Sequence, residues 1–125
     1  MPYQYYNVNP NGYHVPDCVI RAIKTALGLS YYQVMELLHM NGDYFQCDDL
    51  NVQCYEKLLD YDFNLPHFQG CGASAEEIAT YYCDDIVILR MEGHLSVAIC
   101  GVIHDIWDCS DVEVTDYWIV PNNQN

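Results

Sequence analysis

A change of residue pattern near residue 85 is the feature that most constrains how this sequence can fold. Before it, apolar residues recur with helical spacing between capping residues, whereas after it they form short β-branched runs. These runs cover residues 86–89, 95–99, 102–107 and 112–120. Because Gly93 and Gly101 separate the first three runs by short turns, we expect a meander of antiparallel strands. Helices followed by such a sheet indicate an α+β domain.

Capping residues predict four helices in the first two-thirds of the chain. Asp17 occupies an N-cap position and Gly28 ends the helical spacing, so the first helix is expected to start at or beside Cys18. The other predicted helices start at Ser30 (ending at Asn41-Gly42), at Asp48-Asp49, and at a capping box of Ser74 with Glu77 (running to about Tyr82).

The length of 125 residues fits a single domain, and 51% hydrophobic residues are enough to form its core. Residues 1–16 are rich in Tyr, Asn, Pro and Gly, which is typical of turns, so we expect a lead-in loop there. The mainly helical part then covers residues 17–83, and the antiparallel sheet covers residues 85–120.

The charge balance excludes several classes of partner. Four Lys and Arg residues against 18 Asp and Glu residues give a net charge of −14. Binding to phosphate backbones and to anionic membrane surfaces depends on Lys and Arg, so neither nucleic-acid binding nor membrane binding is expected. A solvated acidic surface is the simplest explanation of this charge.

Most of the seven cysteines are expected to be free thiols. Their number is odd, and the N-terminus has neither a basic nor an apolar signal segment, so a reducing cytoplasm is the expected compartment. Cys47, Cys54, His67 and Cys71 lack the close pairing that zinc ligands usually show. We therefore expect no metal and no cofactor.

Cys18 is the residue best suited to nucleophilic chemistry. At the first turn of a helix, backbone N–H groups and the positive end of the helix dipole favour the thiolate over the thiol. A buried structural cysteine is the alternative interpretation. His94 follows Gly93 at the start of a predicted strand, where an imidazole can stand at the edge of the sheet and face a cleft.

The hairpin formed by the second and third runs predicts an acidic partner for this imidazole. Folding of the hairpin brings His94 opposite approximately Asp108. Asp105 is expected to face Val97 or Ala98 instead. A carboxylate beside the imidazole fixes its tautomer and stabilises its protonated form, as in a catalytic triad.

Together these segments resemble the small papain-like cysteine peptidase domains of bacteriophages and Gram-positive bacteria. The resemblance covers roughly residues 7–118 and follows the order Cys, His, acid along the chain. The segments that carry it are Asn9-Pro10, Asp17-Cys18-Val19-Ile20-Arg21-Ala22, Gly93-His94-Leu95 and Asp105-Ile106-Trp107-Asp108-Cys109.

The resemblance implies a papain-like fold and a cysteine peptidase-like hydrolase that cleaves an amide or related acyl bond in a peptide or protein substrate. Cys18 would be the nucleophile and His94 the general base. Asp108, or less favourably Asp105, would be the third member of the triad.

Papain-like enzymes also place a side-chain amide a few residues before the nucleophile, where it helps to stabilise the oxyanion. No Gln stands at that place in this sequence, so Asn9 or Asn11 would have to serve.

Other side chains near these positions have simpler expected roles. Arg21 and Lys24 project from the helix of the nucleophile, and salt bridges to the acidic surface are expected for them. His104 and Cys109 lie close enough in sequence to touch the site, but ordinary sheet positions are expected for both.

Two other functions stay open at this stage. A catalytically silent papain-like protein, such as one encoded by a phage, could bind a factor of the host. If the protein is phage-encoded, the cytoplasm of the host cell is the expected compartment. An acidic decoy of nucleic acid would compete with DNA for a basic protein in a salt-sensitive way and would not depend on Cys18.

Overall fold

The computed structural model describes residues 3–12 and 17–121, which form an α+β arrangement of four α-helices and one six-stranded sheet. In chain order, the elements are β1 (Tyr3–Tyr5), α1 (Cys18–Leu27), α2 (Tyr31–Phe45), α3 (Val52–Lys57) with a following π-helical turn η1 (Leu58–Asp62), β2 (His67–Gln69), α4 (Ala75–Tyr81), β3 (Ile86–Met91), β4 (His94–Ile99), β5 (Val102–Asp105) and β6 (Asp116–Val120). None of the helices in the described ranges is both long and apolar enough to cross a membrane.

The sheet has the strand order β1-β5-β4-β3-β6-β2. The expected antiparallel meander is confirmed for β3, β4 and β5, with turns at Gly93 and Gly101, both at positive φ. The sheet as a whole is mixed, because β1 pairs in parallel with β5. The prediction of a purely antiparallel sheet is therefore wrong.

Two strands lie outside the region expected to form the sheet. Tyr3–Tyr5 was expected in the lead-in loop and forms β1, while His67–Gln69 lies in the mainly helical part and forms β2. Each is only three residues long and pairs with a strand distant in sequence. Such short segments carry no recognisable pattern of their own, so their partners decide their conformation.

The predicted helix starts agree with the structure at three of the four sites. α1 begins at Cys18, and Gly28 caps its C-terminal end at a φ of 69°, which suits glycine. Ser30 and Ser74 both form complete capping boxes at the starts of α2 and α4. Asp48-Asp49 does not open α3, because Asn51 caps that helix by accepting a hydrogen bond from the backbone N–H of Gln53.

The predicted end of α2 at Asn41-Gly42 is also wrong, since the helix continues to Phe45. Gly42 has a packing role rather than a terminating one. A Cβ atom there would lie 2.9 Å from the carbonyl oxygen of Cys47, so the chain that returns after the helix can pass close to it only because this residue is glycine.

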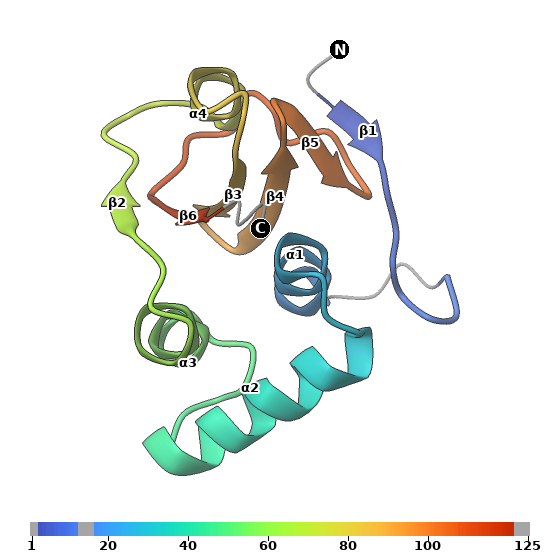
Figure 1. The fold of residues 1–125 in the computed structure, drawn as a ribbon, viewed down its shortest axis with the longest axis vertical. Coiled ribbons are helices and arrows are strands. Elements are labelled where there is room, and N and C mark those ends of the chain that lie inside the picture. The colour runs from blue at the N-terminus through green and yellow to red at the C-terminus, as the bar shows by residue number, and fades with distance from the viewer. Residues whose placement is uncertain (1–2, 13–16, 122–125) are drawn as a thin grey trace.

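Helices cover both faces of the sheet. α1, α2 and α3 lie on one side and α4 on the other (Figure 1). On the first side, Ile23, Leu38 and Leu58 pack with Ile88 of β3 and Trp118 of β6. The second side is a smaller cluster in which α4 packs against alternate residues of β3, β4 and β5. α1 is consequently held against β4, which brings its first turn next to the start of that strand.

The position of α1 depends on Ile23, which is fully buried between this helix and the sheet. Ile23→Ala is expected to lower the free energy of unfolding by about 2–5 kcal/mol, because it removes buried methyl groups and leaves a cavity. Urea-induced unfolding measures this loss. Met40→Ala on α2, where the side chain is 60% exposed, is the control and is expected to change stability by less than about 0.5 kcal/mol. Equal effects of the two changes would contradict the packing described.

Candidate active site

Cys18 is the first residue of α1, as the sequence predicted. The first backbone hydrogen bond of this helix runs from the N–H of Arg21 to the carbonyl of Asp17. The N–H groups of the preceding residues therefore have no intrahelical acceptor, and they point out of the helix end at which the thiol lies. The Cys18 side chain is partly buried, and it lines a cavity together with His94.

His94 begins β4, and its partner is Asp105 at the end of β5. The Nε2 atom of His94 donates to Oδ2 of Asp105 across 2.6 Å, in a pair whose carboxylate is 3% exposed. Because Nε2 is taken by Asp105, Nδ1 is the ring nitrogen left for the Cys18 thiol. Trp107 lies against the imidazole with a ring-centroid distance of 4.8 Å.

Asp108, the aspartate favoured from the sequence, does not reach His94. Its side chain is exposed and accepts hydrogen bonds from the backbone N–H and the hydroxyl of Ser110. The predicted register was also displaced, since Val97 pairs with His104 rather than with Asp105. The chain leaves the ladder after Asp105, so residues 106–109 no longer follow the hairpin geometry from which the prediction was made.

The electrostatics of the three residues favour an ion pair. Burial raises the pKa of the Cys18 thiol, but hydrogen bonds to His94 and to the backbone of Leu95 outweigh it, and the net pKa is lowered. Burial lowers the pKa of His94, but hydrogen bonds to Asp105, Cys109 and Cys18 outweigh it and raise the pKa to about 11. A lowered thiol pKa beside a raised imidazole pKa means that both shifts favour transfer of the thiol proton to the imidazole.

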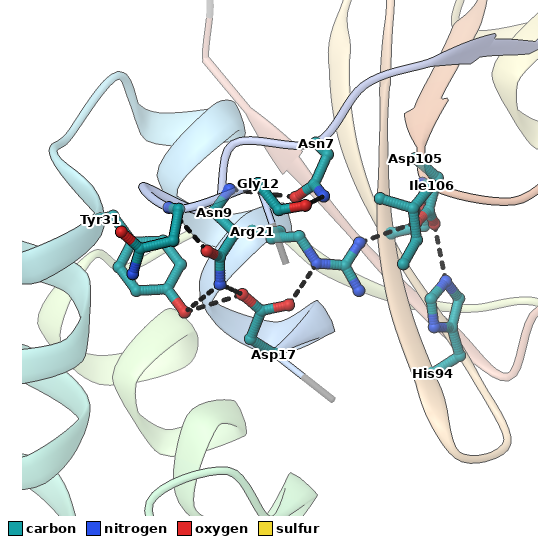
Figure 2. Close-up of polar contacts among 11 residues, drawn as sticks. Asn7, Asn9, Gly12, Asp17, Arg21, Tyr31, His94, Asp105 and Ile106 are labelled. Carbon is teal, nitrogen blue, oxygen red and sulfur yellow. Dashed lines mark hydrogen bonds and ion pairs between the residues drawn. The ribbon is translucent and has the colours of Figure 1, made fainter. Parts of the chain in front are cut away.

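Arg21 connects this group to the start of α1. Its Nε atom binds Oδ1 of Asp17 at 2.6 Å, and its Nη1 atom binds Oδ1 of Asp105 at 3.2 Å (Figure 2). The expected salt bridge of Arg21 is thus present, but it is buried rather than on the acidic surface. Asp17 is correctly placed at the N-cap, yet its carboxylate binds Arg21 instead of capping the helix.

The structure does not bring Asn9 or Asn11 to the position expected for an oxyanion donor. The amide of Asn9 donates to Oδ2 of Asp17 at 2.9 Å, and the Tyr31 hydroxyl donates to the same oxygen at 2.7 Å (Figure 2). The backbone N–H of Asn11 donates to Oδ1 of Asn9. Asn9 therefore belongs to the group around Asp17, Asn11 is exposed beside it, and neither is among the described residues that line the cavity.

The cavity beside Cys18 has a volume of about 210 Å³. Its walls come from the first turn of α1, the start of α3 and the β3–β4 hairpin. Although the chain carries a net charge of −14, none of the described residues that line the cavity is Asp or Glu. Arg90 also lines it, and its guanidinium is paired with Asp116 at 2.6 Å. Among the described residues, the wall of the space next to the thiol thus combines apolar side chains with Asn51, His94 and Arg90 and contains no carboxylate.

Two side chains at the site were missed or underestimated from the sequence. Ser96, a buried residue of β4, donates to Oδ2 of Asp105 at 2.6 Å, and only the observed register shows that it faces this carboxylate. Cys109 is fully buried and its thiol lies 3.7 Å from the same oxygen, so it touches the site. His104 has the ordinary sheet position expected of it, with its ring near Val102 and Tyr6.

Within residues 3–12 and 17–121, two groups of side chains have the spacing of metal ligands. They are His94 with Asp105 and Cys109, and Glu56 with His67 and Asp116. In each group an arginine binds the aspartate, and its guanidinium would repel a cation. The ring nitrogens of His67 bind the carboxylates of Asp60 and Asp116. Among the described residues, neither metal-ligand group contains Cys47, Cys54 or Cys71, the cysteines considered with His67 from the sequence.

No protein-family model matches the chain, and the comparisons with curated proteins and with solved structures found no significant match.

The identity of the acidic partner can be tested with two substitutions that change the net charge equally. Asp105→Asn removes the anion that favours the imidazolium, so the pKa of the Cys18 thiol is expected to rise. Alkylation of Cys18 by iodoacetamide at pH 6 should then slow by about tenfold for each unit of that rise. Asp108→Asn is the control, and it should leave the rate unchanged. The assignment of Asp105 is wrong if Asp108→Asn slows the reaction and Asp105→Asn does not.

The buried carboxylates also predict how stability depends on pH. Burial raises the pKa values of Asp17 and Asp105, but hydrogen bonds from neighbouring side chains outweigh it, and both lie below their ordinary value of 3.8. Because the folded-state pKa is the lower one, this stabilisation is present above pH 3.8 and is lost as the pH falls through the folded-state values.

Urea unfolding between about pH 6 and pH 2 should therefore show a fall in stability on acidification. Asp17→Asn should flatten that fall, whereas Asp111→Asn, at an exposed position, should not. An unchanged slope in Asp17→Asn would contradict the described pairing.

Proposed function

We propose that the protein is a papain-like thiol hydrolase that cleaves an amide or related acyl bond, with Cys18 as nucleophile, His94 as general base and acid, and Asp105 as the residue that orients His94. The observation that carries this proposal is the connected series of thiol, imidazole and buried carboxylate at the wall of a cavity. The α+β arrangement, with the cysteine at the start of a helix and the histidine at the start of a strand, is compatible with a papain-like fold.

The first half of the reaction follows from the protonation states. In the resting state, His94 holds the proton and Cys18 is the thiolate. The sulfur attacks the carbonyl carbon of the substrate and forms a bond to it, and the carbonyl electrons move to the oxygen. Backbone N–H groups at the start of α1, which have no acceptor within the helix, would donate hydrogen bonds to this oxyanion. When the tetrahedral intermediate collapses, His94 gives its proton to the leaving amine and the carbon–nitrogen bond breaks.

The second half returns the enzyme to its starting state. A water molecule gives a proton to His94, and its oxygen attacks the acyl carbon of the thioester. The carbon–sulfur bond then breaks, which releases the acid and regenerates the thiolate beside the imidazolium. Asp105 keeps Nε2 of His94 engaged throughout, so Nδ1 stays directed at the reacting sulfur.

The reactivity of the thiols tests this proposal without knowledge of the substrate. In limited alkylation with iodoacetamide at pH 6, read by mass spectrometry for each cysteine, Cys18 should react at least about tenfold faster than the exposed Cys71, Cys83 and Cys100. His94→Ala should abolish that advantage. If Cys18 reacts at the rate of the exposed thiols in the wild-type protein, the proposed activation of the thiol is excluded.

Hydrolysis itself can be sought with a mixture of unlabelled peptides, by detecting newly formed N-termini. Cys18→Ser and His94→Ala are each expected to abolish cleavage, whereas Cys83→Ser, a matched change at an exposed thiol, should retain it. Cleavage that persists in both Cys18→Ser and His94→Ala would show that the activity does not come from this site.

A further inference from the structure

Arg21 is unusual among the cations of this chain because it is almost completely buried. The sequence has four Lys and Arg residues, and the side chain of Arg21 is only 8% exposed. A buried cation is stable only if anions and hydrogen bonds compensate its charge. Arg21 has two such anions, Asp17 on its own helix and Asp105 on β5.

The contacts of Asp105 divide between its two carboxylate oxygens. Oδ1 accepts from Arg21 and from the backbone N–H of Ile106 at 2.7 Å. Oδ2 accepts from His94 and from Ser96, each at 2.6 Å. Each oxygen thus has two strong donors, and rotation of the carboxylate about its bond to Cβ would break several of these hydrogen bonds at once. Arg21 occupies the side of the carboxylate that does not face the imidazole.

The spacing along α1 places Arg21, which binds Asp105, close to Cys18. Arg21 lies four residues after Asp17 and three residues after Cys18, and at each of these spacings two side chains are neighbours on a helix surface. The helix that carries the thiol therefore also carries the guanidinium that holds the aspartate. Figure 2 shows Arg21 lying between Asp17 and Asp105, with His94 beyond the aspartate.

We infer that Arg21 is a positioning residue for the proposed reaction: it fixes the carboxylate of Asp105 towards His94 and keeps α1 in register with the strand that bears this aspartate. This role rests on the proposed function. Arg21 does not touch the reacting atoms, and it acts through Asp105 and through its positive charge near the thiol.

The test compares how substitutions at Arg21 and Asp17, which keep or change the local charge, affect the reactivity of Cys18. The double variant Asp17→Asn/Arg21→Gln leaves the net charge unchanged and replaces the ion pair by two amides. The pH midpoint of Cys18 alkylation should rise by about one pH unit in this variant. Because less of the thiol is then ionised, alkylation at pH 6 should be about tenfold slower. Asp17→Asn alone removes an anion beside the thiol and should not raise the midpoint. Lys24→Gln, on the same helix, should leave it unchanged.

Arg21→Lys keeps the buried charge and decides the question if the double variant does not fold. A lysine offers one ammonium group instead of a planar fork, so it cannot hold Asp17 and Asp105 as arginine does, and the midpoint should again rise. The Nε2 proton of His94 gives a second measurement by NMR. Its resonance should be shifted downfield in the wild-type protein by the bond to Asp105, and it should move upfield in both Arg21 variants.

The outcomes separate this inference from the proposed function. A low midpoint in the wild-type protein that rises in the Arg21 variants supports both. A low midpoint that stays unchanged in folded Arg21 variants overturns the positioning role and leaves the proposed function standing. An ordinary midpoint for wild-type Cys18 overturns the proposed function and the role of Arg21 with it.

Discussion

The buried guanidinium of Arg21 links the start of α1 to the end of β5. Hydrophobic packing holds α1 against the sheet, but apolar contacts alone do not fix how far a helix may slide or rotate. Arg21 adds a directional link, because its planar group contacts Asp17 on the helix and Asp105 on the sheet at the same time. Burial of an ionic group requires its desolvation, so such a group adds little to the net stability of the fold. Its value here is geometric, since the position of Asp105 relative to Cys18 depends on it.

The electrostatic environment of Cys18 differs from that of the molecular surface. Acidic residues give the chain its net charge of −14, and they dominate its long-range field. Around Cys18 the short-range interactions have the opposite effect, because hydrogen bonds to His94 and to the backbone of Leu95, together with the charges of His94 and Arg21, lower the pKa of the thiol. Short-range groups in a partly buried site outweigh distant, water-screened carboxylates. A chain this acidic can therefore still stabilise a thiolate.

Local signals in the sequence predicted the helix that carries the thiol, whereas contacts between distant segments decided the rest of the site. Gly28 and the serine caps are recognised within a few residues, and Cys18 was placed correctly for this reason. Choosing between Asp105 and Asp108 required the exact end of a strand, which depends on pairing rather than on composition. The roles of Ser96 and β1 depend on the same pairing. Asn9 was assigned by its distance along the chain from Cys18, and that distance does not show that its amide binds Asp17.

The parallel pairing of β1 with β5 affects when the site can form during synthesis on the ribosome. The backbone carbonyl of Asp105 accepts hydrogen bonds from the N–H of Tyr6 and from the hydroxyl of Tyr3, a residue 102 positions earlier in the chain. Contacts over such a separation form late, because a large loop must close before they are gained. While the chain is being synthesised, Cys18 emerges long before His94 and Asp105 do. Until the last strands are in place, Cys18 lacks the hydrogen bonds to His94 and to the backbone of Leu95 that lower the pKa of its thiol, so this thiol acquires its lowered pKa only in the complete fold.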